Sequence, residues 1–192
     1  MQIEMTSLPG VLLIKPRVFH DDRGRFFESF QAERYAEHGI NLAFVQDNIS
    51  YSKKGTLRGL HYQLAHPQGK LVSVIQGKVF DVAVDIRLGS KTFGQSFSCE
   101  LSDKNHHQLY IPPGFAHGFY VLSDDVCFHY KCTDYYQPGD EYGIAWHDET
   151  LEINWPLQKQ PLLSPKDKLY VALRDTPIEN LPKMDAYSEL KK

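Results

Sequence analysis

The run at residues 79–87, Val-Phe-Asp-Val-Ala-Val-Asp-Ile-Arg, restricts the possible folds of this chain more than any other stretch. Its even positions carry Phe80, Val82, Val84 and Ile86, and its odd positions carry Val79, Asp81, Ala83, Asp85 and Arg87. Such alternation after a glycine turn, here Gln76-Gly77, is typical of a half-buried antiparallel strand. The less apolar face of this region carries His, Lys and Asp instead of the Thr and Ser of an ordinary solvent-facing strand. We therefore interpret it as the wall of a β-barrel whose polar interior is open to a ligand.

Short strand-like segments also fill the rest of the chain. Further strands are expected at residues 10–16, 44–52, 93–101, 108–111, 115–122 and 126–133. The last two are predicted to pair as a hairpin around Ser123-Asp124-Asp125. A helix is expected at residues 31–38, ended by Gly39, and the sequence at residues 164–167 is expected to open another. Turns about every 8–12 residues favour a sandwich or barrel, so the predicted fold class is all-β with a few short peripheral helices.

Size and charge exclude several classes of protein. At 192 residues the chain fits a single domain, 1–192, in which residues from about 176 to 192 are expected to form a loosely attached tail. The formal net charge of −3 argues against nucleic acid as a partner. No apolar run approaches the roughly 20 residues of a membrane span, and the N-terminus does not resemble a signal peptide. Three cysteines at unhelpful spacings predict neither a disulfide framework nor a zinc site, and we expect a cytoplasmic protein.

Motifs along nearly the whole chain carry a resemblance to a known family. They lie at residues 22–28, 44–48, 57–63, 68–72, 81–87, 111–119, 130–133, 138–141, 143–146 and 163–167. The most distinctive are Leu-Arg-Gly-Leu-His-Tyr-Gln at 57–63 and Ile-Pro-Pro-Gly-Phe-Ala-His-Gly-Phe at 111–119. In this order they resemble the dTDP-4-dehydrorhamnose 3,5-epimerase family, metal-free cupins of nucleotide-sugar biosynthesis.

The resemblance implies a cupin-type jelly-roll barrel, usually a homodimer in which an N-terminal strand joins the partner's sheet. It implies inversion of C3 and C5 of a dTDP-4-keto-6-deoxy-hexose, with no metal and no cofactor. It makes His61 the proton acceptor, Asp167 its partner and Tyr130 the proton donor, and it places Tyr136 against thymine. The remaining substrate contacts that it implies are Arg23, Glu28, Gln46, Asp47, Asn48, Arg58, Lys70, His117, Glu141 and Lys166.

The chemistry of such a reaction fits the residue types. Removing a proton next to a ketone leaves an enolate, so the site needs a base, a donor on the opposite face and a positive charge at the oxygen. An imidazole such as that of His61 titrates near pH ~6.5, and a carboxylate such as Asp167 would fix its tautomer. Lys70 suits the enolate oxygen as a compact cation. The phenol of Tyr130, with an ordinary pKa of about 10, stays protonated as a donor.

Structural explanations compete with several of these roles. Ser164 and Asp167 match a helix-capping box with proline at the first helical position, and Lys70 could be an exposed strand lysine that discourages edge pairing. Arg58 and His61 are separated by an odd number of residues, so a regular strand would point them to opposite faces. A bulge at Gly59 would re-aim one of them.

Other functions remain open from the sequence. A metal-dependent cupin is favoured by Gly55 and His61, and by Pro112-Pro113-Gly114 followed by His117. Gln63, however, occupies the position of the second histidine of the usual metal motif, and an amide is a poor ligand for a transition metal. A non-catalytic sugar-binding barrel is a second alternative. An epimerase acting at C3 or C5 alone is a third, and a 3,4-ketoisomerase is less favoured because the motifs around His61 and Tyr130 are complete.

Overall fold

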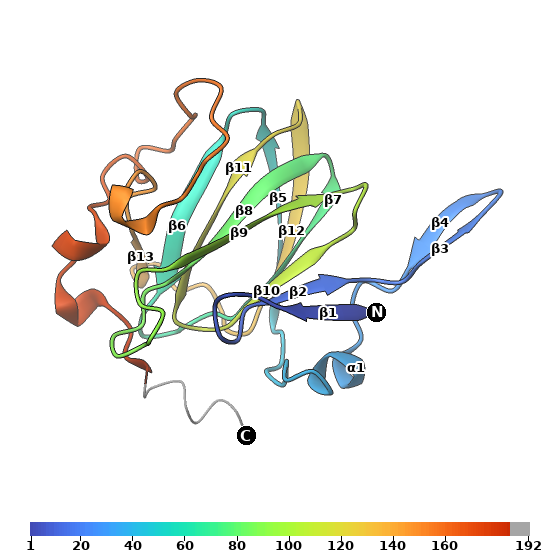
Figure 1. The fold of residues 1–192 in the computed structure, drawn as a ribbon, viewed down its shortest axis with the longest axis horizontal. Coiled ribbons are helices and arrows are strands. Elements are labelled where there is room, and N and C mark those ends of the chain that lie inside the picture. Colours follow the sequence, from blue (N-terminus) through green and yellow to red (C-terminus); the bar gives the residue numbers. More distant parts are fainter. Residues whose placement is uncertain (185–192) are drawn as a thin grey trace.

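The computed structural model describes residues 1–184, and strands make up most of its regular structure (Figure 1). One sheet has the order β1 (Gln2–Met5), β2 (Leu12–Lys15), β10 (Gln108–Ile111), β7 (Lys70–Gln76), β12 (Asp125–Cys132) and β5 (Gln46–Lys53). The other has the order β13 (Glu141–Gly143), β6 (Leu57–Gln63), β11 (Phe115–Val121), β8 (Lys78–Asp85) and β9 (Ser96–Ser102). The strand pairs within both sheets are antiparallel. The all-β prediction is confirmed.

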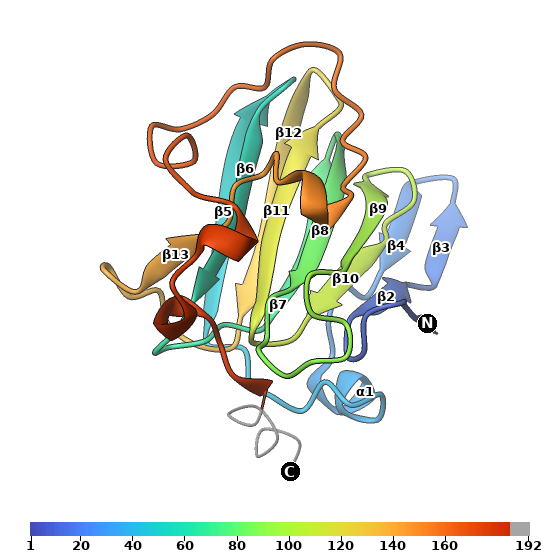
Figure 2. The same ribbon diagram turned by 60° about the vertical axis from the view of Figure 1, so that its left-hand side comes forward.

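The two sheets face each other and enclose a hydrophobic core, as in a jelly-roll barrel. Alternation along β8 divides its side chains as predicted: Ala83 joins the interior cluster, whereas Val82 and Val84 lie in a second cluster on the outer face. The segment after β13 crosses this outer face and covers it with Leu173 and Leu181 (Figure 2). The central strands of the five-stranded sheet are therefore buried on both faces, while the barrel interior stays available for polar groups at one end.

The predicted hairpin between residues 115–122 and 126–133 is wrong. β11 pairs with β6 and β8, whereas β12 pairs with β5 and β7 in the opposite sheet. The turn at residues 122–124 therefore passes from one sheet to the other. Sequence spacing alone suggested a hairpin because a turn that changes sheets is as short as one that stays within a sheet.

The N-terminal region adds an arm and a helix to the barrel. β3 (Val18–Asp21) and β4 (Gly24–Phe27) form a separate two-stranded hairpin that projects away from the sheets (Figure 1). Its Phe19 and Phe26 are 51% and 71% exposed. The helix expected at 31–38 is confirmed as α1 (Ala32–Ala36), which is followed by Gly39 at a φ of +88°. Large exposed aromatic side chains on a projecting hairpin are typical of a surface that meets another chain.

The C-terminal segment is irregular but attached. Its short 3-10 helices are η1 (Glu149–Leu151), η2 (Leu173–Asp175) and η3 (Ile178–Asn180). Residues 164–167 form a turn and not the helix that we expected, because nothing continues the helical hydrogen bonds beyond Leu169. We predicted a loosely attached tail from about residue 176. In the part of it that the structure describes, up to residue 184, Leu181 is buried and the backbone N–H of Leu88 donates to the carbonyl of Pro182. Residues 185–192 lie outside the described residues. No helix within residues 1–184 is long and apolar enough to cross a membrane.

A bulge in β6 allows the side chains of two predicted site residues to point to the same side of the strand. His61 lies opposite His117 and Arg58 opposite Phe119, so three steps along β6 match two steps along β11. Gly59 is at the irregularity with a φ of +119°. Because the bulge adds one residue, Arg58 and His61 line the same cavity despite their odd separation.

Replacing this glycine should be costly. In Gly59→Ala the new Cβ would lie 2.6 Å from the Cα of Gly118, in a backbone region that side chains rarely adopt. Overpacking costs about 1–3 kcal/mol and positive φ about 1–2 kcal/mol more, so we expect a loss of about 2–5 kcal/mol in the free energy of unfolding. Chemical denaturation measures it, with Gly89→Ala as control, since Gly89 has a φ of +85° but no neighbour within 4 Å. Equal losses in the two variants would contradict the close packing at Gly59.

Candidate active site

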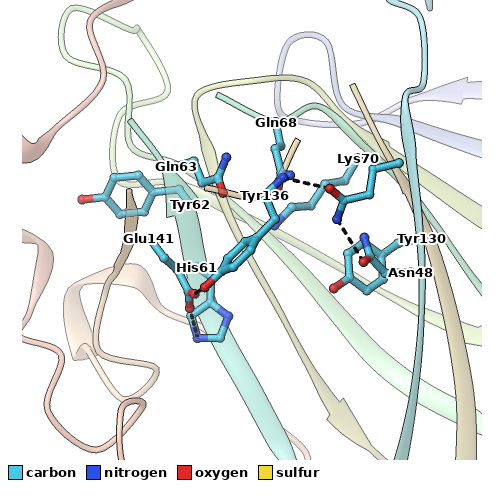
Figure 3. Close-up of a pocket in the computed structure, with 10 residues that line it drawn as sticks. Asn48, His61, Tyr62, Gln63, Gln68, Lys70, Tyr130, Tyr136 and Glu141 are labelled. Atoms are coloured by element: carbon cyan, nitrogen blue, oxygen red, sulfur yellow. Dashed lines mark hydrogen bonds and ion pairs between the residues drawn. The ribbon is translucent and has the colours of Figure 1, made fainter. Parts of the chain in front are cut away.

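The interior of the barrel opens at one end into two adjoining cavities, each of about 150 Å³. Both are lined by His61, Lys70 and Tyr130, so the two cavities meet at these side chains. Figure 3 shows the side chains that line one of the two cavities. The other predicted site residues that line one cavity or the other are Gln46, Asn48, Arg58, His117, Tyr136 and Glu141. The polar barrel interior predicted from the alternation in β8 is therefore present.

His61 is paired with Asp167. Nε2 of His61 lies 2.5 Å from Oδ1 of Asp167, whose side chain is only 3% exposed. Ser164 Oγ donates to Oδ2 of Asp167 at 2.9 Å and accepts from its backbone N–H at 3.1 Å. Burial opposes ionisation of this carboxyl, but the bonds from His61 and Ser164 outweigh burial and hold the pKa of Asp167 below its usual range. The capping contacts expected at Ser164 are thus present, and they hold a carboxylate against an imidazole.

Lys70 brings a cation into the same space. It begins β7, where Val72 and Val74 belong to the interior cluster, so strand parity directs Lys70 inward. Figure 3 shows no hydrogen bond or ion pair between its ammonium group and the other residues drawn. Burial lowers the pKa of Lys70, while the negative charges of Glu141 and Asp81 act in the opposite direction. A half-buried cation with no hydrogen bond or ion pair within residues 1–184 can receive an anionic atom of a ligand.

Tyr130 lies on the wall opposite His61. It belongs to β12 in the six-stranded sheet, whereas His61 belongs to β6 in the five-stranded sheet. Burial raises the pKa of Tyr130, so its phenol stays protonated at neutral pH. A base on one sheet and a proton donor on the facing sheet can act on opposite faces of a ligand held between them.

A second group of side chains forms the mouth of the cavities. Glu141 accepts from the hydroxyl of Tyr136 and from the ammonium of Lys166, both at 3.0 Å, and its other oxygen lies 4.0 Å from Nε2 of His61. Burial raises the pKa of Glu141, but Lys166, His61 and Tyr136 outweigh that effect and lower it. Tyr136 is 47% exposed, and its aromatic ring can receive a flat ligand group. This region therefore combines stacking with charge.

Hydrogen bonds fix the remaining amides and one further histidine. Gln46 accepts from the backbone N–H of Tyr136 at 2.8 Å and donates to Asn48 at 3.0 Å. His117 lies 3.0 Å from both carboxylate oxygens of Asp81, and both side chains are buried. The sequence did not identify Asp81 as a site residue. Its place on the polar face of the alternating run at residues 79–87 was the available signal.

Five predicted site residues do not line the cavities: Lys166 and Asp167 bond to Glu141 and His61, which do, whereas Asp47, Arg23 and Glu28 bond to residues outside the cavities. Asp47 alternates with Gln46 and Asn48, so it lies on the outer face of β5, where it pairs with Lys131 at 2.8 Å. Arg23 and Glu28 lie on or just after the projecting β3–β4 hairpin, bonded to Asp21 and Arg34 respectively. The side chain of Arg23 is 90% exposed.

Gln63, which stands where a metal histidine was considered, has a structural role. Its amide donates to the carbonyl groups of His66 and Tyr135 at 2.6 and 3.2 Å, and it accepts from the backbone N–H of Gln137 at 3.0 Å. It thus joins two loops at the mouth. Residues 1–184 contain no group of three His, Cys, Asp or Glu side chains that could hold a metal ion.

The fold and the cavities together define a class of protein: a jelly-roll enzyme whose ligand space is surrounded by an imidazole–carboxylate pair, a phenol and a lysine, which are groups that can transfer protons or stabilise charge. A family model described as dTDP-4-dehydrorhamnose 3,5-epimerase matches residues 5–175. The chain belongs to this family, whose members are isomerases, and the resemblance seen in the sequence is confirmed.

Known relatives agree with this assignment. The chain is 52% identical over 176 residues to a dTDP-4-dehydrorhamnose 3,5-epimerase of Pseudomonas aeruginosa, covering 91% of this chain and 97% of that protein. It is 55% identical over 167 residues to one of Neisseria gonorrhoeae, covering 87% of this chain but only 51% of that longer protein. A crystal structure of dTDP-6-deoxy-D-glucose-3,5-epimerase from Legionella pneumophila, in complex with dTDP-4-keto-L-rhamnose, is 55% identical, with a TM-score of 0.93 and coverage of 95% and 97%.

Proposed function

We propose that this protein inverts C3 and C5 of a dTDP-4-keto-6-deoxy-hexose, converting dTDP-4-dehydro-6-deoxyglucose to dTDP-4-dehydro-L-rhamnose. The observation that carries the proposal is the placement of the His61–Asp167 pair and Tyr130 on facing sheets, with Lys70 lining the same cavities. A sugar-binding module without catalysis has no need of this arrangement. The relatives named for this reaction support the choice of substrate.

The first half of the reaction is removal of a proton. His61 takes the proton from the carbon beside the C4 ketone, and the electron pair of the broken C–H bond moves to the carbonyl oxygen as an enolate. Asp167 stabilises the imidazolium that forms, because its carboxyl is ionised well below neutral pH. Lys70 stabilises the enolate oxygen, since a cation in a partly buried site interacts more strongly with a new negative charge than it would in water.

The second half returns a proton to the other face. Tyr130 donates its phenolic proton to the enolate carbon from the opposite wall, the electron pair of the enolate forms the new C–H bond, and the C4 ketone is restored. The carbon is then inverted. His61 and Tyr130 return to their starting protonation states by exchange with solvent at the open mouth, and the same steps act at the second carbon.

The nucleotide must extend beyond the two cavities, because each is smaller than the roughly 300–1,000 Å³ of a typical ligand pocket. Tyr136 at the mouth stacks on the thymine, and Arg58 and Lys166 supply positive charge for the diphosphate. We further propose a homodimer in which the β3–β4 hairpin of each chain brings Arg23 and Glu28 to the site of its partner. The exposed Phe19 and Phe26 of that hairpin support it.

The reaction is tested by isotope exchange. The protein is incubated with dTDP-4-keto-6-deoxyglucose in deuterated water, and the sugar is followed by NMR. Deuterium at both C3 and C5 with inverted product is the expected result, whereas deuterium at one carbon identifies the epimerase that acts at a single centre. The exchange should also survive exhaustive chelation, since the proposed chemistry uses only side chains. Absence of exchange would contradict the proposal.

We also propose that the protein is located in the cytoplasm, because its three free cysteines fit a reducing compartment.

Binding of the nucleotide should depend on Arg58. This side chain donates to Ser52 at 3.0 Å and has no carboxylate bonded to it within residues 1–184, so its charge is available to the diphosphate. Arg58→Ala should weaken dTDP binding by about 1–3 kcal/mol, or roughly 5–150-fold in Kd, the usual scale for a contact to a charged group. Calorimetric titration measures it, with Arg174→Ala on the distant η2 as control. An unchanged Kd in Arg58→Ala would remove this residue from the site.

A further inference from the structure

Tyr170, which has no role in the chemistry proposed above, packs against the base. Its ring meets that of His61 edge to face, with 5.7 Å between centroids and 69° between planes. Its hydroxyl oxygen is buried and has no hydrogen-bond partner within residues 1–184. A hydroxyl buried in this way destabilises a protein, so the hydroxyl does not explain why a tyrosine occupies this position. The contacts of its aromatic ring explain it instead.

The ring of Tyr170 rests on a glycine. Gly143 in β13 lies opposite His61 in β6 in the sheet register. A Cβ atom placed on Gly143 would come within 3.0 Å of three atoms of the Tyr170 ring, a separation that real side chains do not show. The φ of Gly143 lies outside the left-handed region, so its backbone does not require glycine. The absence of a side chain at Gly143 therefore makes room for the aromatic ring beside His61.

Tyr170 also belongs to the segment that supplies Asp167. Residues 164–171 form neither a helix nor a strand, and a carboxylate on such a turn needs support to stay within about 0.5 Å of a working position. Two backbone contacts hold the segment: Leu169 N–H donates to the carbonyl of Lys166 at 3.0 Å, and Ala145 N–H donates to that of Val171 at 2.8 Å. Side-chain contacts from Lys166 to Glu141 of β13 and from Asp167 to His61 add to these. Between Leu169 and Val171, the ring of Tyr170 lies against both Gly143 of β13 and the imidazole.

We propose that Tyr170 is a positioning residue: its ring, seated on Gly143, holds the imidazole of His61 and the turn of Asp167 in the relative placement that proton transfer requires. The inference rests on the proposed role of His61 as base. The hydroxyl of Tyr170 takes no part. Gly143 is required for this placement, because any side chain at that position would displace the ring of Tyr170.

Kinetics of four variants test the proposal. Tyr170→Ala and Gly143→Ala should each lower kcat for exchange and inversion by about 10–100-fold, since a displacement of about 1 Å in a catalytic group costs up to about 10². Their KM should change less than kcat, because Arg58 and Tyr136 lie outside this segment and Lys166 is the one proposed nucleotide contact that lies on it. Tyr170→Phe, which keeps the ring, should retain the wild-type kcat and a Tm no lower than wild type. Leu169→Ala is the matched control on the same segment, as Leu169 is 79% exposed.

A second measurement does not depend on activity. In protein labelled with nitrogen-15 at histidine, NMR should detect the proton between His61 Nε2 and Asp167, slowed in exchange with water by their bond. The signal should persist in Tyr170→Phe and Leu169→Ala and be lost in Tyr170→Ala and Gly143→Ala. If Tyr170→Ala does not fold, Tyr170→Leu replaces it. A folded ring-removing variant that keeps both kcat and the signal overturns the proposal. Loss of the signal together with full activity would instead show that His61 is not the base.

Discussion

The His61→Ala variant should lose about 10²–10⁴-fold in the rate of deuterium exchange and of inversion, the usual worth of general acid–base catalysis. The loss should appear at both C3 and C5, because the same imidazole serves both carbons. Nucleotide binding should change little, since Arg58, Lys166 and Tyr136 lie away from the proton being removed. Single-turnover exchange in deuterated water measures the chemical step, and calorimetry with dTDP measures binding.

His66→Ala is the matched control for this variant. His66 lies on the loop after β6, its side chain is half exposed, and it pairs with Asp134 outside the proposed chemistry, so its removal should leave the rate unchanged. Asp167→Asn should lose less than His61→Ala, because the amide retains a contact to the imidazole and removes only the charge that stabilises imidazolium. Exchange that persists near the wild-type rate in His61→Ala would identify another base and remove the present assignment.

Tyr130→Phe should separate exchange from inversion. His61 can still form the enolate and Lys70 can still stabilise it, so deuterium should enter the substrate. Inverted product should form about 10²–10⁴-fold more slowly, because the donor on the opposite wall is missing and the proton returns to the face that it left. Folding should be intact, since the ring still packs beside Phe128.

The quantity to compare is the ratio of exchange to inversion in the variant and in the wild type, because water can reprotonate the enolate slowly from the far side. Tyr51→Phe provides the control, as Tyr51 is 76% exposed on the outer surface of β5. If exchange and inversion fall by the same factor in Tyr130→Phe, Tyr130 is not the acid on the opposite face.

Local patterns in the sequence predicted the features that depend on residues close together in the chain, such as the face of a strand on which a side chain lies. Alternation assigned the faces of β8, and the same parity places Gln46 and Asn48 inside the barrel. The motifs also named residues that line the cavities, such as His61, Lys70 and Tyr130, without any knowledge of distances. The pairing of β12 with β5 and β7 could not be predicted, because it depends on which sheet a strand joins after a short turn.

The differences at the site have the same origin. The motif lists Asp47 among the substrate contacts, whereas strand parity places it on the opposite face of β5 from Gln46 and Asn48. The Ser164–Asp167 contacts were predicted as a helix start, and a pattern of two residues cannot tell whether a helix follows. No pattern in the sequence pointed to Tyr170, because its proposed role depends on a contact with Gly143, a residue that is distant from it in the chain.

In the proposed homodimer, the projecting β3–β4 hairpin completes the partner's site, so each separate chain would be an incomplete enzyme. A lone molecule exposes Phe19 and Phe26 to water and holds Arg23 far from its own cavities. In the proposed dimer, turnover per chain becomes a function of protein concentration and falls on dilution below the dissociation constant of the pair. Substrate that contacts both chains would oppose dissociation of the dimer on dilution, since a ligand that binds only the dimer shifts the equilibrium towards it. Supply of the sugar nucleotide would then regulate how much active enzyme exists, as well as how fast it works.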